Sequence, residues 1–490
     1  MNKVRFAPSP TGYLHIGGLR TALYNYLFAK NNKAKFLLRI EDTDRTRYVE
    51  KADQQIIETL RTFGIDFDEG PFYQSKRLDI YKKYVEQLIK EDKAYYCFCT
   101  KERLDEMRKT QQAEKRIPKY DRHCLNLSPA EINEKLKNKE PYVIRLKLPD
   151  NQDIIFKDGV YGEVKINTND MDDQVLLKSD GYPTYHLAVV VDDHEMDITH
   201  IIRGEEWLPS TPKHVLLYQM FNWDAPKFIH LPLLLNPDKS KLSKRQGDVA
   251  AEDFLNKGYL PEAILNYIAF LGWNPKTTKE IYSIEELIKD FDVAKINKAG
   301  AIFNIEKLNW FNAEYVRNIV KEKGKRYEEL LEKVKKYFPP DLDKTKLENI
   351  FIVLSSRLNY LSELGESSGF IFKLPDYDSE KLIFSDKEKA IKGLEYIKLR
   401  LSEVSEEAWE DKTFWVLPGP KKYNNFFTYL TDFFTEKIKK NNLSPGDTFS
   451  PLRWSLSGSK NSPSPAEIIW ILGKEESLIR IDKALEKLNS

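Results

Sequence analysis

Two stretches of the sequence carry residues that could handle a phosphate group. The first, His15-Ile16-Gly17-Gly18, follows a turn rich in proline and glycine and opens a run with helical spacing. The second, Lys241-Leu242-Ser243-Lys244, has a lysine at each end. Helix N-termini attract anions, and lysine ammonium groups can follow a charge that moves during a reaction. Each stretch also has an ordinary interpretation, since a histidine before a helix can simply cap it or pack, and a lysine-rich run is most often a solvated loop.

Two arginines could bind the carboxylates of a substrate, and a glutamate lies where it could contact the same ligand. Arg5 lies within the first apolar run of the chain, and Arg203 and Glu41 each come at the end of a later one. A guanidinium group pairs bidentately with a carboxylate. Ligands of open α/β sheets bind at the carboxyl ends of the strands, which is where these side chains would meet. The ordinary alternatives are a surface salt bridge for Arg203 and a helix cap at Thr43 or Asp44, which would leave Glu41 unexplained.

All three cysteines of the chain fall in one short segment, at Cys97, Cys99 and Cys124. Three cysteines among 490 residues cannot form a disulfide framework, which suits a reducing compartment. Their clustering predicts a structural zinc site, for which a fourth ligand is needed. His123 is the better ligand by chemistry, although adjacent residues rarely turn both side chains to one metal. The alternative is that three reduced thiols pack in a small core.

The elements that would position these residues alternate between strand and helix. Apolar runs at 4–6, 36–40 and 187–191 predict strands, because continuous apolar runs are typical of parallel strands buried on both faces. Apolar residues at helical spacing predict helices over 52–63 and 75–90. In the second half of the chain the pattern becomes mostly helical. We therefore expect an α/β fold followed by an all-helical part.

The composition is typical of a soluble globular protein. Hydrophobic residues make up 41% and charged residues 31% of the chain, and the net charge is +1. A nearly neutral chain gives no general sign of a nucleic-acid partner, so any RNA-binding surface must be local. No apolar run approaches the length of a transmembrane helix, and the N-terminus does not resemble a signal peptide. We expect a cytoplasmic protein without membrane contact.

The motifs resemble those of class I aminoacyl-tRNA synthetases of the glutamyl branch. The histidine motif belongs to PSPTGYLHIGG, which is similar to the H-I-G-H region of that family, with Gly18 in place of the second histidine. RIEDTDR, DGYPTYHLA and IIRGEEW are similar to the branch's amino-acid pocket. The lysine motif resembles the K-M-S-K-S loop, with Leu242 for methionine and Arg245 for the last serine. The Walker and dinucleotide-binding glycine patterns are absent.

The resemblance implies a role for each site residue. It implies that ATP is bound by His15, Gly17, Glu206, Lys241, Ser243 and Lys244, with His15, Lys241 and Lys244 as the catalytic residues. It implies that L-glutamate is bound by Arg5, Ala7, Ser9, Glu41, Tyr185 and Arg203. Arg5 and Tyr185 would read the side-chain carboxylate, Arg203 the α-carboxylate, and Ser9 and Glu41 the amino group. Some relatives bind zinc through C-x-C and Y-x-x-x-C, which favours Tyr120 over His123 as the fourth ligand.

The resemblance also implies the architecture. A Rossmann-like parallel sheet would form the catalytic domain, with an inserted α+β subdomain that binds the acceptor end of tRNA and all-α anticodon-binding domains after it. The expected limits are 1–80 with 185–238 for the catalytic domain, 81–184 for the insertion, 239–320 for a stem-contact domain, and 321–375 and 376–490 for two anticodon-binding domains.

The implied activity is the ATP-dependent joining of L-glutamate to tRNA(Glu), through a glutamyl-adenylate, with Mg²⁺ accompanying ATP and Zn²⁺ in a structural role. Whether tRNA(Gln) is charged as well stays open, and a monomer is expected. A shorter glutamyl-queuosine synthetase would lack the long helical part, and a glutaminyl-tRNA synthetase should carry a β-barrel-like C-terminal part. A non-catalytic RNA-binding paralogue is disfavoured because such paralogues tend to lose the phosphate-handling side chains, and His15, Lys241 and Lys244 are all present.

Overall fold

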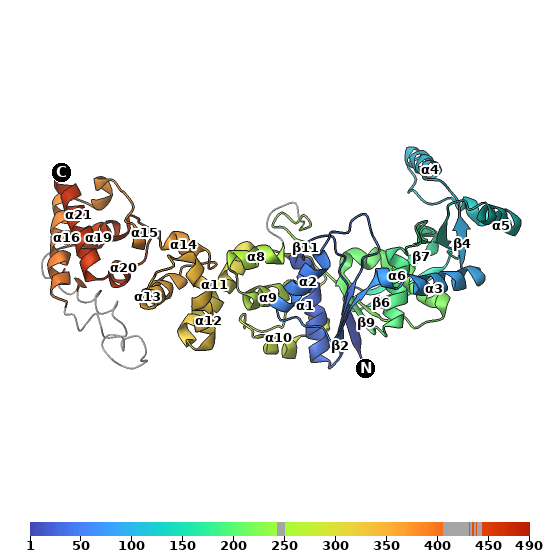
Figure 1. Ribbon diagram of the computed structural model, residues 1–490, viewed down its shortest axis with the longest axis horizontal. Coiled ribbons are helices and arrows are strands. Elements are labelled where there is room, and N and C mark those ends of the chain that lie inside the picture. Colours follow the sequence, from blue (N-terminus) through green and yellow to red (C-terminus); the bar gives the residue numbers. More distant parts are fainter. Residues whose placement is uncertain (243–249, 405–430, 432–433, 436–437, 439–442) are drawn as a thin grey trace. The chain divides into compact units, whose positions relative to one another are not determined.

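The computed structural model describes the chain except for residues 243–249, 405–430, 432–433, 436–437 and 439–442. The described residues divide into two compact units, Met1–Phe311 and Asn312–Ser490. Figure 1 shows that strands occur in the first unit and that the second is built from helices. Among the described helices none is long and apolar enough to cross a membrane.

The first unit is organised around two main sheets. One sheet has the order β1-β2-β3 with all strands parallel, and consists of β1 (Lys3–Phe6), β2 (Lys35–Ile40) and β3 (Glu69–Tyr73). The other has the order β7-β6-β10-β9 and is antiparallel only between β6 and β7; it consists of β6 (Asp153–Asp158), β7 (Gly162–Asn167), β9 (His200–Gly204) and β10 (Lys227–Leu231).

The two sheets meet between β1 and β9. Thr199, the residue before β9, donates its backbone N–H to the carbonyl oxygen of Lys3 at 2.9 Å. Residues at the carboxyl ends of both strands, Phe6 of β1 and Gly204 of β9, line the same cleft, at the point where the strand order changes direction. Open α/β sheets bind their ligands at such a point.

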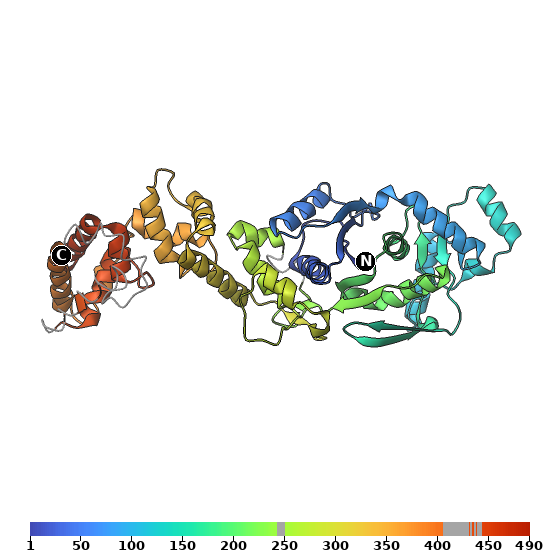
Figure 2. The same cartoon turned by 90° about the horizontal axis from the view of Figure 1, so that it is seen from below.

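Helices cover both sheets and fill the segments between strands (Figure 2). Those of the first unit are α1 (Ile16–Asn31), α2 (Ala52–Thr62), α3 (Leu78–Lys90), α4 (Lys101–Ala113), α5 (Pro129–Lys137), α6 (Tyr185–Glu195), α7 (Thr211–Phe221), α8 (Ala251–Lys257), α9 (Pro261–Ala269) and α10 (Ile284–Asp290), and α11 (Ile305–Glu322) runs across the boundary of the units. A third sheet is antiparallel and consists of β4 (Ala94–Cys97), β5 (Val143–Leu146) and β8 (Val175–Leu177), and β11 (Leu234–Leu235) pairs with β12 (Ala301–Ile302).

The second unit contains only helices among its described elements. They are α12 (Lys325–Val334), α13 (Lys344–Ser355), α14 (Glu363–Ser367), α15 (Gly369–Phe372), α16 (Lys387–Ser402), α19 (Pro445–Ser457), α20 (Pro465–Leu472) and α21 (Lys474–Asn489). Gly393 of α16 lies so close to α19 that an added Cβ would stand 2.6 Å from the carbonyl oxygen of Asp447. Only glycine therefore allows these two helices to pack at this distance.

Two local predictions are wrong. Residues 187–191, predicted as a buried parallel strand, lie in helix α6 and are all buried, because α6 packs against α3 and α7 in the core. An apolar run that is buried on every side has the same pattern in a helix as in a strand. The predicted cap at Thr43 or Asp44 is also wrong, since α2 begins only after Lys51, and Asp44 instead accepts a hydrogen bond from the hydroxyl of Thr46.

Candidate active site

A cleft of about 930 Å³ is lined by the carboxyl ends of β1 and β9 and by the turns that follow them. Every described residue of the predicted ATP and glutamate sites lines it: Arg5, Ala7, Ser9, His15, Gly17, Glu41, Tyr185, Arg203, Glu206 and Lys241. Ser243 and Lys244 lie outside the described residues. Both flanks of their segment reach the cleft, because Leu242 lines it and Ala250 forms an antiparallel bridge with His15.

His15 stands at the N-terminus of α1 and caps it. Its Nδ1 accepts a hydrogen bond from the backbone N–H of Gly18 at 3.1 Å, while its side chain stays exposed in the cleft. A Cβ on residue 17 would lie 3.1 Å from the imidazole ring, so a side chain there would crowd the ring and glycine does not. The first turn of α1 contains no acidic residue, so the positive end of the helix dipole is not neutralised there. Capping and anion binding can therefore coexist at this helix end.

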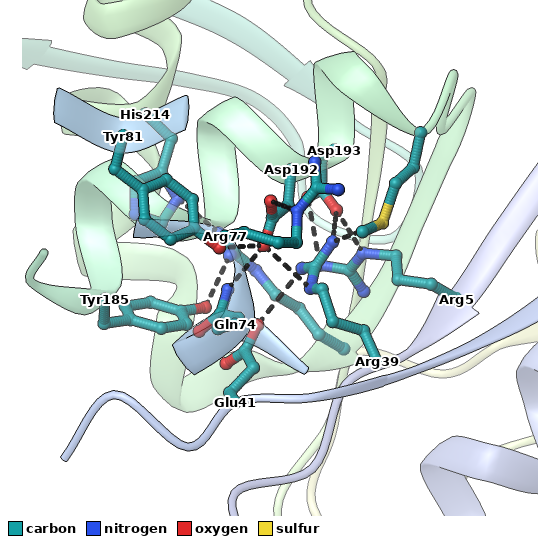
Figure 3. Close-up of polar contacts among 12 residues, drawn as sticks. Arg5, Arg39, Glu41, Gln74, Arg77, Tyr81, Tyr185, Asp192, Asp193 and His214 are labelled. Carbon is teal, nitrogen blue, oxygen red and sulfur yellow. Dashed lines mark hydrogen bonds and ion pairs between the residues drawn. The ribbon is translucent and has the colours of Figure 1, made fainter. Parts of the chain in front are cut away.

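Arg5 and Glu41 belong to one buried network of charges (Figure 3). The carboxylate of Asp193 accepts hydrogen bonds from Arg5 Nε at 2.9 Å and Nη2 at 3.3 Å, and from Arg39 Nη1 at 2.7 Å. Arg39 donates in turn to Glu41 at 3.1 Å. The two bonds to Asp193 leave Nη1 of Arg5 for a further carboxylate, and Arg5 lines the cleft. Asp193 thus fixes the guanidinium of Arg5 without using all of its donors.

Burial and charge act in opposite directions on the two carboxylates of this network. Burial raises the pKa of Asp193, but Arg5 and Arg39 outweigh it and hold that pKa below its ordinary value. Burial also raises the pKa of Glu41, and Arg39 and Arg5 offset only part of the increase. Of these two carboxylates, Glu41 is therefore the one that gains a proton first when the pH falls.

Asp192, the neighbour of Asp193 on α6, anchors the other side of the network. It accepts hydrogen bonds from Gln74 at 2.9 Å, from Arg77 at 2.8 Å and from the hydroxyl of Tyr81 at 2.8 Å. These partners come from the chain between the end of β3 and the first turn of α3. The pair of carboxylates therefore ties α6 to β1 and β2, which carry Arg5 and Arg39, and to α3.

Arg203, at the end of β9, is buried among neutral acceptors. Its Nε donates to His230 at 3.1 Å, Nη1 to the hydroxyl of Tyr185 at 3.0 Å, and Nη2 to Thr211 at 2.8 Å and His214 at 3.2 Å. In the described part of the chain, no carboxylate lies at ion-pair distance from it. A buried guanidinium with only neutral partners is a strong site for a carboxylate ligand, because the ligand supplies the missing counter-charge.

The histidines around Arg203 are neutral. Burial lowers the pKa of His230, and burial together with Arg203 and His186 holds that of His214 well below its ordinary value. Burial also lowers the pKa of His186 to about 4. Because arginine can only donate, His214 presents a lone pair on Nδ1 to Arg203 and carries its proton on Nε2, 3.0 Å from His186. These imidazoles orient Arg203 without adding positive charge to the pocket.

The three cysteines form a separate cluster, in the chain between the end of β4 and the start of α5. Their sulfur atoms all lie within 4.8 Å of one another, and Cys99 and Cys124 are 3.5 Å apart. The hydroxyl of Tyr120 is 3.3 Å from the sulfurs of Cys97 and Cys99. No histidine nitrogen of the described residues belongs to the group, so His123 does not join it. The geometry brings together the four side chains of the Tyr120 alternative.

Sequence reasoning missed several residues that shape the cleft, namely Arg39, Asp158, Asp192, Asp193, Thr211, His214 and His230. Most lie inside strands or helices and carry no motif of their own. One signal was present, since Asp192 and Asp193 directly follow the apolar run 187–191, and buried carboxylates need buried cationic partners. The partners themselves lie far away in the sequence and could not be identified from it.

Comparisons with known proteins agree with this geometry. A family model described as class I tRNA synthetases (E and Q), catalytic domain, matches residues 2–310, and an anticodon binding domain model matches 329–415 and 428–485. The glutamate–tRNA ligase of Finegoldia magna is 45% identical, with 99% of each chain covered, and that of Clostridioides difficile is 44% identical, with 98% of each covered. A crystal structure of a glutamate tRNA ligase from Elizabethkingia meningosepticum in complex with its amino acid is 38% identical with a TM-score of 0.85, and 99% of each chain is covered.

Proposed function

Because this chain belongs to the glutamate–tRNA ligases, a family of class I tRNA synthetases, we propose that it joins L-glutamate to tRNA(Glu) in two steps. In the first, an oxygen of the α-carboxylate attacks the α-phosphorus of ATP, which forms glutamyl-adenylate and releases pyrophosphate. In the second, a hydroxyl of the terminal adenosine of tRNA attacks the glutamyl carbonyl and releases AMP. Neither step needs a nucleophile from the protein, so its task is to position the reactants and stabilise charge.

The observation that carries this proposal is the surroundings of Arg203. A buried guanidinium held only by neutral groups accepts the α-carboxylate, at one side of a cleft whose other side is the N-terminus of α1. On that side His15, Gly17 and Glu206 would hold ATP. This arrangement favours a reaction between a carboxylate and a nucleotide phosphate.

The remaining contacts follow from the same cleft. Nη1 of Arg5, with Tyr185, would read the side-chain carboxylate of glutamate, while Glu41, Ser9 and the backbone at Ala7 would take its amino group. Enzymes of this class use Mg²⁺ with ATP, where the metal neutralises phosphate charge. For the developing pyrophosphate, the proposed partners within the protein are Lys241, Ser243 and Lys244.

The remaining parts of the chain would contact tRNA. The match to an anticodon binding domain supports tRNA binding by the helical second unit. We assign the acceptor end of tRNA to the inserted segment, 81–184, and the stem to 239–320. The anticodon falls to 321–375 and 376–490. We expect the chain to act as a cytoplasmic monomer.

We also propose that Cys97, Cys99, Tyr120 and Cys124 hold a structural Zn²⁺. A tetrahedral site with Zn–S bonds of about 2.3 Å needs sulfur atoms within ~4 Å of one another, which the spacing of Cys99 and Cys124 satisfies. The metal would join β4 to the turn at Cys124 and so stabilise the inserted segment.

The decisive experiment is aminoacylation. Purified tRNA(Glu) and tRNA(Gln) are incubated separately with the protein, ATP and labelled glutamate or glutamine. We expect glutamate to be transferred to tRNA(Glu), and glutamine to neither tRNA; transfer of glutamate to tRNA(Gln) as well would define the wider tRNA range. Folded protein that charges neither tRNA with glutamate, and does no better than its Arg203→Gln variant, would overturn the proposal.

A further inference from the structure

The carboxylate of Asp158 lies one imidazole ring away from Arg203. Its Oδ2 is 2.6 Å from Nδ1 of His230, and both side chains are completely buried. Its Oδ1 accepts the backbone N–H groups of Val160 and Tyr161, each at 2.9 Å, where β6 turns into β7. One oxygen therefore shapes the hairpin, and the other is available to act on the histidine.

The contact with Asp158 determines which nitrogen of His230 carries the proton. An ionised carboxylate can only accept a hydrogen bond, so the proton lies on Nδ1 and the neutral ring presents a lone pair on Nε2. Nε2 in turn is the atom that accepts the N–H of Arg203 Nε at 3.1 Å. With the opposite tautomer two N–H groups would face each other, and Arg203 would lose the partner that fixes one edge of its guanidinium.

We propose that Asp158 is a positioning residue for the α-carboxylate of the amino acid, acting through the tautomer of His230 on Arg203. This inference rests on the assignment of Arg203 made under the proposed function. The imidazole also keeps the carboxylate of Asp158 from pairing with Arg203 directly, so the positive charge of the guanidinium and one N–H of Nη1 are left for the substrate. Because Asp158 ends β6, the inserted segment contributes to the amino-acid pocket through this residue.

The substitution Asp158→Asn separates this role from the role in the hairpin. Asparagine keeps an oxygen for the backbone N–H groups of the turn but replaces Oδ2 by an NH₂ group, which donates to Nδ1 and drives the proton of His230 to Nε2. We expect KM for glutamate to rise by about 10- to 100-fold, the scale of losing a hydrogen bond to a charged group, with KM for ATP unchanged. Asp153→Asn on the same strand is the control, because Asp153 pairs with Lys165 near the surface.

Two substrate fragments identify the carboxylate concerned. L-2-Aminobutyrate keeps the α-carboxylate and lacks the side-chain one, whereas 4-aminobutyrate keeps the side-chain carboxylate and lacks the α-carboxylate. Inhibition of glutamylation should weaken in Asp158→Asn for L-2-aminobutyrate and stay unchanged for 4-aminobutyrate. A purely structural defect would weaken both inhibitors alike, and that result would overturn the inference.

A double-mutant cycle gives an independent test. The substitution His230→Gln offers Arg203 an amide oxygen and leaves no tautomer to set. In this background Asp158→Asn should therefore cause little further rise in KM for glutamate. Additive losses would contradict the inference. Should Asp158→Asn fail to fold, His230→Gln and His230→Leu are compared with the same inhibitors. We then expect inhibition by L-2-aminobutyrate, and not by 4-aminobutyrate, to weaken in His230→Leu and to stay unchanged in His230→Gln. Equal behaviour of the two variants overturns the inference.

The outcomes distinguish the possible errors. Wild-type protein that does not glutamylate tRNA refutes the proposed function itself. An active wild type with an Arg203→Gln variant that weakens both fragments equally refutes the assignment of Arg203. Selective weakening in Arg203→Gln without any change in Asp158→Asn leaves both of those intact and refutes only the role of Asp158.

Discussion

Replacing Arg5 by alanine should weaken the use of glutamate far more than that of glutamine. Asp193 occupies Nε and one N–H of Nη2, at 2.9 and 3.3 Å, so Nη1 remains for the side-chain carboxylate. A hydrogen bond to a charged group contributes about 1.5–3 kcal/mol, and 1.4 kcal/mol is a factor of ten, so kcat/KM for glutamate should fall roughly 10- to 100-fold. The side chain of glutamine places an NH₂ donor opposite the Nη1 donor of Arg5, so kcat/KM for glutamine should change little in Arg5→Ala.

The same substitution also affects stability, and this effect must be separated from the loss of binding. Breaking a buried ion pair costs about 3–5 kcal/mol when the remaining charge is left alone, and less here because Arg39 keeps Asp193 paired at 2.7 Å. Arg77→Ala is the matched control, since Arg77 pairs with Asp192 at 2.8 Å in the same network and does not line the cleft. Urea unfolding of both variants measures the change in the free energy of unfolding.

The assay is steady-state aminoacylation with labelled glutamate and labelled glutamine, which gives the ratio of the two kcat/KM values. Arg5→Ala should lower this ratio and leave KM for ATP unchanged, whereas Arg77→Ala should keep it. A wild-type ratio in Arg5→Ala would mean that another residue reads the side-chain carboxylate. An equal loss in Arg77→Ala would trace the effect to the stability of the network instead.

Three other substitutions or conditions test the remaining assignments. Lys244→Ala should slow adenylate formation by ~10²–10³-fold in single turnover, as expected for one preorganised donor, with glutamate affinity nearly unchanged. Metal analysis of chelator-washed protein should find about one zinc per chain, which Cys124→Ser loses and His123→Asn keeps. Burial raises the pKa of the Glu41 side chain, and protonated Glu41 no longer pairs with the amino group of the substrate. As the pH falls, kcat/KM for the substrate should therefore drop at a higher pH than the titration of an exposed glutamate side chain would give. Glu41→Gln should abolish this pH dependence.

Each of these has a contrary result. An unchanged single-turnover rate removes Lys244 from the mechanism. Protein that contains no metal, and is as stable with chelator as without it, excludes the zinc site. An acid limb that persists in Glu41→Gln belongs to a different group.

The family, the fold class and the function are confirmed predictions, and they rested on short motifs at the ends of elements. Arg5 and Arg203 converge in one cleft because the strands that carry them, β1 and β9, both have their carboxyl ends at this cleft. Local chemistry that depends on a few adjacent residues could be predicted as well. An example is the serine at 128 followed by Glu131 three residues later, a pattern typical of a capping box, and these two residues form that box at the start of α5.

What the sequence could not supply is pairing across long stretches of chain. Asp193 lies just after the run 187–191, which was misread as a strand, and its partners Arg5 and Arg39 belong to different strands. Asp158 and His230 meet only because β6 and β10 are neighbours in the second sheet. No periodicity or composition encodes which strands become neighbours, so the supports of the predicted residues appear only in three dimensions.

The position of β6 beside β10 has a practical consequence for shortening the protein. β10 is buried from Phe228 to Leu231, and β6 covers its outer side, with Gly159 donating its N–H to the carbonyl oxygen of Phe228 at 2.8 Å. Excising residues 81–184 as a block would remove this cover and turn an apolar inner strand into an exposed edge. Such edges recruit strands from other molecules, so the truncated chain would aggregate. A minimal catalytic fragment must therefore keep the β6–β7 hairpin.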